Sequence, residues 1–121
     1  MATILALGLD PRAVSPGAIP GLTPDLVHAY IAAQLDRVRA LGHSVEPCLV
    51  DTDAGAAESE LRRKLEETEF DCVLVGAGLR APEHLQLFEQ LLNTIHRCAT
   101  HASICFNTTP ADSAEAVQRW V

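Results

Sequence analysis

Residues 3–9 read Thr-Ile-Leu-Ala-Leu-Gly-Leu, and residues 72–75 read Cys-Val-Leu-Val. Both runs are continuously apolar instead of alternating with polar residues, a pattern typical of strands that are covered on both faces. Turn residues follow each run: Asp10-Pro11 after the first and Gly76-Ala77-Gly78 after the second. The two runs therefore predict buried strands of a parallel sheet.

Two more short apolar runs, residues 45–50 and 103–106, predict a second and a fourth strand. Amphipathic helical patterns separate and follow the runs. We expect the first helix to be capped by Thr23 and to end at Gly42, and the second to span about 56–68. We expect the third helix to begin at Pro82. The last helix is expected to begin with a capping box formed by Asp112 and Glu115 and to end at Trp120.

Strand and helix alternate four times along the chain. This order predicts an α/β three-layer sandwich, in which a four-stranded parallel sheet has helices on both faces. Right-handed crossovers favour the strand order 2-1-3-4, which is a flavodoxin-like or Rossmann-like arrangement. The length of 121 residues suits a single domain, residues 1–121.

The composition excludes some classes of protein. Apolar residues make up 48% of the chain, enough to bury a core, so a disordered chain is excluded. The net charge of −7 argues against a nucleic-acid partner. No run is long enough to cross a membrane, and no export signal precedes the first strand, so we predict a cytoplasmic protein. The cysteines are far apart, which favours reduced core residues.

In open parallel sheets, ligands bind at the carboxyl ends of the strands, beside the point where the strand order switches. For the predicted order, this point lies between the first and third strands. The residues that follow the four strands are therefore the candidate ligand-binding residues: Asp10, Arg12, Asp51, Gly76, Gly78, Arg80, Asn107 and Thr108.

Residues 76–81 fit the pattern G-x-G-x-x-A between a strand and a helix. Glycines there allow an anion to approach backbone N–H groups, and Arg80 offers a guanidinium for phosphate or carboxylate oxygens. A dinucleotide is disfavoured, because the motif follows the third strand and Asn107, not an acid, ends the next one. A smaller anion fits better, and a tight turn is the simplest explanation of the glycines.

The segment 10–22 is long for a strand-to-helix connection and contains three prolines. Proline limits the conformations of a free loop, so the segment is either a shaped cover over a ligand or a surface loop that packs on the sheet edge. Loop length does not distinguish the two interpretations.

Asp10, Asp51 and Asp53 follow the first two strands, as acids follow strands in phosphorylation receiver domains. The third strand ends in Gly76, where a receiver has its phosphoacceptor aspartate, and Asp53 suits a helix cap. We therefore predict neither a metal nor a cofactor. No G-x-S-x-G, H-E-x-x-H or P-loop pattern is present, and Asp10 and His84 are the acid–base candidates.

The segments 7–11, 20–23, 75–80 and 104–108 resemble those of a family of small, uncharacterised α/β proteins. The resemblance covers nearly the whole chain. It implies the α/β fold, but it provides no known activity to transfer to this chain.

Two functions remain in competition. The first is the binding of a small anionic metabolite at the C-terminal edge of the sheet, by a binding protein or a small enzyme. The second is a non-enzymatic interaction module, a homodimer, suggested by a sheet that lacks a fifth strand. In the second case, Val117 and Trp120 would cover the last strand in part, unless Trp120 packs into its own core.

Overall fold

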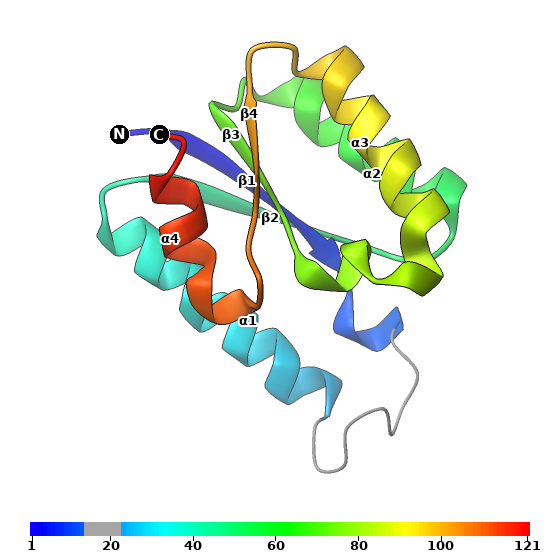
Figure 1. Ribbon diagram of the computed structural model, residues 1–121, viewed down its shortest axis with the longest axis horizontal. Helices are drawn as coiled ribbons and strands as arrows, with labels where there is room; N and C mark the ends of the chain where they lie inside the picture. Colours follow the sequence, from blue (N-terminus) through cyan, green and yellow to red (C-terminus); the bar gives the residue numbers. More distant parts are fainter. Residues whose placement is uncertain (14–22) are drawn as a thin grey trace.

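The computed structural model describes residues 1–13 and 23–121 (Figure 1). Strands β1 (Thr3–Leu9), β2 (Ser44–Val50), β3 (Cys72–Val75) and β4 (Ser103–Phe106) form a four-stranded sheet. All neighbouring strands are parallel and their order is β2-β1-β3-β4. This confirms the predicted sandwich and strand order. The flavodoxin-like and Rossmann-like labels stay predictions.

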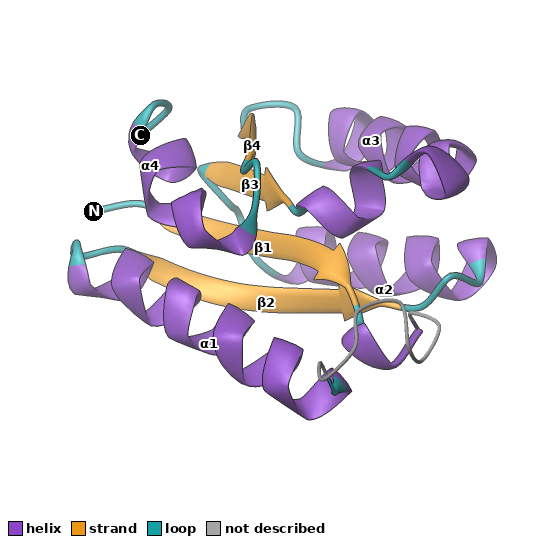
Figure 2. Ribbon diagram, turned by 60° about the horizontal axis from the view of Figure 1, so that its bottom comes forward, coloured by secondary structure: helices purple, strands orange, loops and turns teal. Residues whose placement is uncertain are grey.

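The helices are α1 (Pro24–Ala40), α2 (Ala54–Glu67), α3 (Leu85–Cys98) and α4 (Ser113–Gln118). Helices α1 and α4 pack on one face of the sheet, and α2 and α3 on the other (Figure 2). The central strands are therefore covered on both sides, as their continuous apolar sequences predict.

Alternation along β1 divides the core into two layers. Leu5, Leu7 and Leu9 face α2 and α3, where they join a cluster that contains large residues such as Leu61 and Leu91. The intervening residues of β1, among them Ala6, face α1 and α4. Helix α1 buries only Leu35 and Val38 among its seventeen residues, so it contributes few side chains to its core layer.

The helix starts follow the predicted chemistry. Thr23 caps α1, and its side-chain oxygen accepts a hydrogen bond from the Leu26 N–H at 3.2 Å. Gly42 has φ +99°, a conformation that side chains disfavour, and it follows the end of α1. Asp53 accepts from the Gly55 N–H at 3.0 Å, so α2 begins at Ala54, slightly before the predicted start near residue 56.

One predicted helix start and one predicted capping box are wrong. Pro82 opens a separate 3-10 turn, and α3 begins only at Leu85. The last capping box is formed by Thr109 and Asp112, not by Asp112 and Glu115. Pro110 is suited to the first helical position and starts the turn earlier than expected.

The chain after α4 also differs from the expectation. Trp120 lies beyond the last helical residue, Gln118, and 58% of its surface is exposed. The interpretation in which Trp120 packs into its own core is therefore wrong. Val117 is fully buried, so it is the residue of this pair that contributes to the core.

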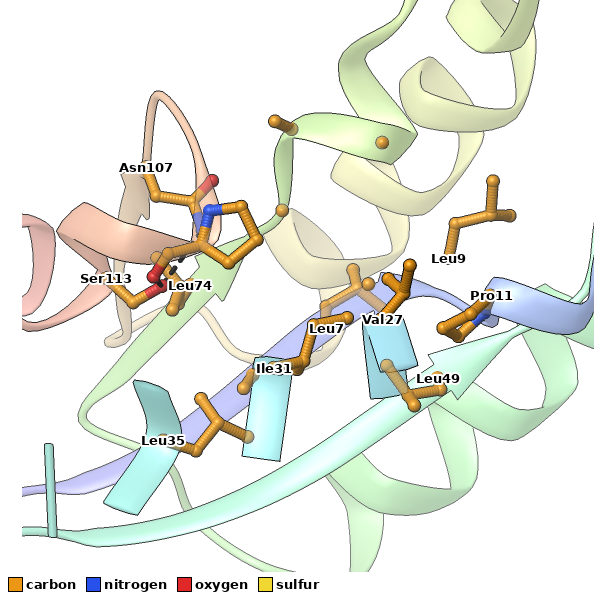
Figure 3. Close-up of a pocket in the computed structure, with 16 residues that line it drawn as sticks. Leu7, Leu9, Pro11, Val27, Ile31, Leu35, Leu49, Leu74, Asn107 and Ser113 are labelled. Carbon is orange, nitrogen blue, oxygen red and sulfur yellow. Dashed lines mark hydrogen bonds between the residues drawn. The ribbon is translucent and has the colours of Figure 1, made fainter. Parts of the chain in front are cut away.

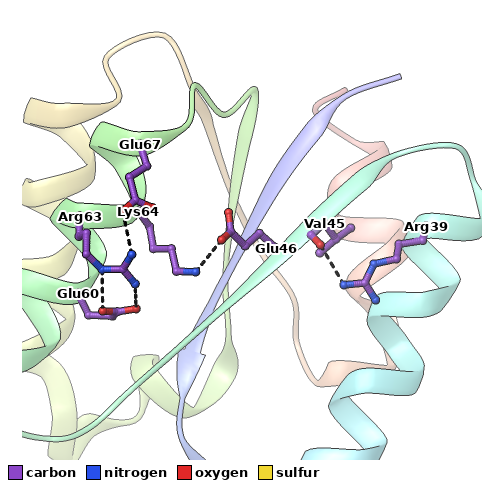
Figure 4. A network of polar contacts seen from close by, with 7 residues as sticks. All are labelled: Arg39, Val45, Glu46, Glu60, Arg63, Lys64 and Glu67. Carbon is purple, nitrogen blue, oxygen red and sulfur yellow. Dashed lines mark hydrogen bonds and ion pairs between the residues drawn. The ribbon is translucent and has the colours of Figure 1, made fainter.

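The polar face of α2 is a solvated network of ion pairs (Figure 4). Arg63 binds Glu60 at 2.7 Å and Glu67 at 2.9 Å, and all three side chains are substantially exposed. Exposed pairs of this kind add little stability. Lys64 differs, because its ammonium reaches Glu46 at 2.6 Å and so links α2 to β2.

All four cysteines are free, and Cys48, Cys72 and Cys105 are buried, whereas Cys98 is half-buried. Burial raises the pKa of Cys48 to about 11, which keeps its thiol neutral at ordinary pH. Their role as small core residues agrees with the sequence. In the described part of the chain, none of the helices has the length and apolar character needed to span a bilayer.

Candidate functional site

A cavity of about 190 Å³ lies at the C-terminal edge of the sheet, between the ends of β1 and β3 and against α1 (Figure 3). β1 has β2 on one side and β3 on the other, so the strand order switches here, where α/β sheets commonly bind ligands. The cavity is lined by Ala6, Leu7, Gly8, Leu9, Pro11, Val27, Ile31, Leu35, Leu49, Leu74, Gly76, Ala77, Gly78, Asn107, Pro110 and Ser113.

Small residues leave the space that the cavity occupies. Ala6 faces the α1 layer, and Gly8 and Gly76 are the next alternate positions on that face of β1 and β3. A Cβ on Gly76 would lie 3.5 Å from the carbonyl oxygen of Leu7, and one on Gly8 would lie 3.3 Å from Cδ2 of Leu49. At these positions the floor of the cavity is backbone, not side chain.

Helix α1 supplies the opposite wall. Val27, Ile31 and Leu35 recur every four residues and form one stripe along the helix. Leu35 is buried, whereas Val27 and Ile31 keep part of their surface exposed. The incomplete burial of this stripe follows from the small residues opposite it, because none of the described residues places a large side chain in the gap.

The polar side chains of the lining, Asn107 and Ser113, lie together at one end of the cavity (Figure 3). Asn107 follows β4, and only 5% of its surface is exposed. Its Nδ2 donates to Oγ of Ser113 at 3.0 Å, and that hydroxyl donates to the carbonyl of Pro110 at 2.8 Å. The other described residues of the lining have no polar side chain.

Arg80 fixes the orientation of the Asn107 amide. Its Nη2 donates to the backbone carbonyl of Asn107 and, at 3.2 Å, to the side-chain Oδ1. A guanidinium is only a donor, so the oxygen of the amide must face Arg80 and the NH₂ group must face Ser113. The guanidinium also lies 5.1 Å from the centroid of the Phe106 ring.

These contacts give Arg80 a different role from the one that the sequence predicts. The sequence predicts a cation that binds an anion, but Arg80 is not among the cavity-lining residues, and its Nη2 is bound to Asn107. Its Nε is buried and has no partner among the described residues. In this structure Arg80 positions a lining residue instead of lining the cavity itself.

The structure brings together only part of the predicted site. Gly76, Gly78 and Asn107 line the cavity, as the switch-point argument predicts. Asp51 and Thr108 lie outside its lining. The carboxylate of Asp51 accepts from the neighbouring Thr52, and the hydroxyl of Thr108 donates to Asp112 at 2.7 Å.

Asp10 and Arg12 are also outside that lining. The carboxylate of Asp10 accepts from the Arg12 N–H at 3.0 Å, as in an aspartate-initiated turn. Asp10 borders a neighbouring hollow between α1 and β2, together with His28 and Arg39. The predicted cover, residues 10–22, lies for the larger part outside the described residues, since residues 14–22 are not among them.

Asp112 and Asp53, which lie near this edge, form hydrogen bonds with residues close to them in the sequence. The hydrogen bond from the Thr108 hydroxyl lowers the pKa of Asp112, and backbone N–H groups of Thr108 and Thr109 add to the effect. Asp53 caps α2. Among residues 1–13 and 23–121, no group of three or more potential ligands is arranged to hold a metal.

The acid–base candidates are not part of the cavity. His84 lies in the 3-10 turn before α3, and neither His84 nor Asp10 contributes to the lining. None of the described lining residues has a titratable side chain. The described lining is suited to holding a molecule by shape and by hydrogen bonds at one end.

The sequence interpretation missed most of the apolar lining. Ala6, Gly8, Ile31 and Ser113 were not among the candidates, because each has an ordinary structural explanation in the sequence. A usable signal was present: two small residues in alternate positions near the end of a buried strand reduce packing on one face only. The stripe from α1 would then be identified as the opposite wall.

Comparisons of the chain with protein-family profiles, with curated proteins and with solved structures found no match. The resemblance to a family of small α/β proteins therefore stays a prediction.

Proposed function

We propose that this protein binds a small molecule at the C-terminal edge of its sheet, in the cavity between α1 and the ends of β1 and β3. The observation that carries the proposal is the gap left by Ala6, Gly8 and Gly76 at the switch point of the strand order. A close-packed interior rarely leaves such space. The cavity lies where folds of this class bind ligands.

The lining favours a molecule whose body is apolar. A cavity of about 190 Å³ is small, and a comparable dry cavity of ~150 Å³ holds benzene. We therefore expect a single ring or a short branched chain with a small substituent. The anionic ligand predicted from the sequence remains compatible if the charge is a carboxylate on such a body.

Thermal denaturation with acetophenone, benzoate and cumene tests the proposal. A ligand at about ten times its Kd stabilises the folded state by ~1.4 kcal/mol. For a domain of this size that corresponds to a rise in Tm of about 3–6 °C. We expect at least one of the three compounds to produce such a rise.

Ala6→Leu places a larger side chain in the cavity and should abolish the rise in Tm. Ala33→Leu is the matched control, because Ala33 is exposed on α1 and does not line the cavity. Gly76→Ala is a milder filling variant, since its added carbon meets only ordinary contacts. A ligand that stabilises Ala6→Leu as much as the wild type would refute the proposal, and so would the lack of any response.

A second candidate function is self-association through the edge of β4. β4 pairs with β3 on one side only, and alternate residues of a strand direct their backbone groups outward. Phe106 is 39% exposed at this edge, and a groove beside it is lined by Leu92, Asn93, His96 and Ile104. A second copy would pair antiparallel to β4 about a twofold axis.

Arg119 covers part of this edge, because its Nη2 donates to the carbonyl of Phe106 at 2.9 Å. Arg119→Ala should therefore strengthen association, whereas Ile104→Lys should weaken it by placing a charge on the edge. Sedimentation velocity at micromolar concentration measures both effects. A 13.0 kDa monomer in the wild type and in Arg119→Ala would exclude the dimer.

A further inference from the structure

We infer that the ligand of the cavity carries one oxygen hydrogen-bond acceptor, a carbonyl or carboxylate oxygen, on its apolar body, and that Asn107 binds this oxygen. The inference rests on the proposed function and names the chemistry that the cavity recognises. It depends on one hydrogen atom of the Asn107 amide.

The Asn107 amide has a donor to spare. Its Nδ2 carries two hydrogens, and one of them is bound by Oγ of Ser113 at 3.0 Å. The second has no acceptor among the described residues. Only 5% of the surface of Asn107 is exposed. A buried donor without an acceptor lowers the stability of the folded state. An oxygen of the ligand would remove this cost.

Ser113 does not compete for the same role. Its hydroxyl hydrogen is given to the carbonyl of Pro110 at 2.8 Å, so Ser113 acts toward Asn107 as an acceptor. The polar end of the cavity therefore offers a ligand the N–H of Asn107. A ligand that presents only donors, such as an ammonium group, cannot use this N–H.

Arg80 strengthens the preference for an acceptor. Its guanidinium binds both oxygens of Asn107, which places a positive charge on the far side of the same amide. Polarisation through a hydrogen-bond chain makes the opposite N–H a better donor. Both a neutral carbonyl and a carboxylate benefit, and the two differ in the cost of removing them from water.

The remaining lining limits the ligand to one polar group. Apart from Asn107 and Ser113, the described residues that line the cavity have no polar side chain. A second polar group on the ligand would lose its hydrogen bonds to water without compensation. The structure therefore favours compounds such as aryl ketones or aromatic acids over polyhydroxylated or multiply charged metabolites.

The test measures Kd for acetophenone, benzoate and cumene with the wild type and with Asn107→Leu. Acetophenone and cumene have nearly the same shape, and only acetophenone has an acceptor. Because the compounds differ in their affinity for water, each is compared between the two proteins. We expect Asn107→Leu to raise the Kd for acetophenone about tenfold. The Kd for cumene should stay the same or fall.

Two further variants keep the result interpretable. Asn107→Asp preserves the oxygen for Arg80 but removes the NH₂ donor, and it replaces Asn107→Leu if that variant does not fold. Ser113→Ala leaves the Asn107 donor in place, so its Kd for acetophenone should stay within about threefold of the wild-type Kd. Benzoate decides between the two acceptors: if Asn107→Leu weakens it as well, carboxylates belong to the ligand class, and otherwise neutral carbonyls alone do.

The two proposals fail differently. If none of the compounds binds, or if Ala6→Leu does not affect binding, the cavity is not a ligand site and the proposed function is wrong. The other outcome is that the compounds bind to the wild type and not to Ala6→Leu, while Asn107→Leu changes the Kd for acetophenone and the Kd for cumene by the same factor. In that case the cavity binds ligands, and the role assigned to Asn107 is wrong.

Discussion

Arg80 connects the end of β3 to the end of β4 through a single residue, Asn107. Its guanidinium is held between the oxygens of Asn107 and the ring of Phe106, which itself makes an edge-on contact with Phe88 at 5.8 Å between centroids. This set of contacts assigns Arg80 a structural task, so it should affect stability even in the absence of a ligand.

Arg80→Ala should lower the free energy of unfolding by about 1–3 kcal/mol, because the oxygens of Asn107 lose a donor in a buried position. Urea denaturation measures the change. Arg97→Ala is the control, since Arg97 is exposed on α3, and its effect should stay near 0.5 kcal/mol or below. Equal effects of the two substitutions would show that Arg80 has no such structural task.

At the scale of elements, helix caps connect the sequence to the structure. Asp53 accepts hydrogen bonds from the N–H groups of Gly55 and Ala56, and these groups have no partner within α2 itself. The cap therefore sets where α2 begins. The alternative role of Asp53, as part of a carboxylate cluster, has no support in the described residues.

Asp53→Ala should lower the free energy of unfolding by about 1 kcal/mol, whereas Asp53→Asn should retain most of the stability, because asparagine caps helices as well as aspartate does. Thermal and urea denaturation measure both. Glu66→Ala, an exposed residue of the same helix, should have little effect. A loss in Asp53→Asn equal to that in Asp53→Ala would mean that the negative charge, not the cap, is what stabilises α2.

The strands and their order could be predicted because their signal is local and strong. Residues 3–9 and 72–75 are continuously apolar, and right-handed crossovers between parallel strands leave few topologies. The cavity could not be predicted in the same way. It depends on Ala6 and Gly8 lying opposite Ile31 of α1, and that pairing exists only after the helix has packed on the sheet.

The role of Arg80 beside Asn107 could not be predicted for a related reason. The sequence places both residues at the right edge of the sheet, and this part is correct. Whether a guanidinium binds a ligand or a neighbouring loop depends on which acceptor is within reach, and here Asn107 supplies two oxygens. Sequence spacing contains no information on that competition.

For the whole molecule, the net charge of −7 does not describe the candidate site. The acidic residues are distributed over the four helices, β2 and the loops, and several form ion pairs or caps, such as Glu60 and Asp53. The cavity itself is apolar with a neutral amide at one end. The overall charge of the protein therefore gives no information about the kind of ligand that we propose for the cavity.

The central claim is that a small molecule binds between α1 and the ends of β1 and β3. An amide NMR titration with acetophenone, benzoate or cumene, whichever binds most tightly, tests it most directly. The account predicts that the largest shifts fall on the backbone amides of Gly8, Gly76 and Gly78 and on the side-chain amide of Asn107. It predicts that these shifts disappear in Ala6→Leu. Shifts confined to other surfaces, or the same shifts in Ala6→Leu, would contradict it.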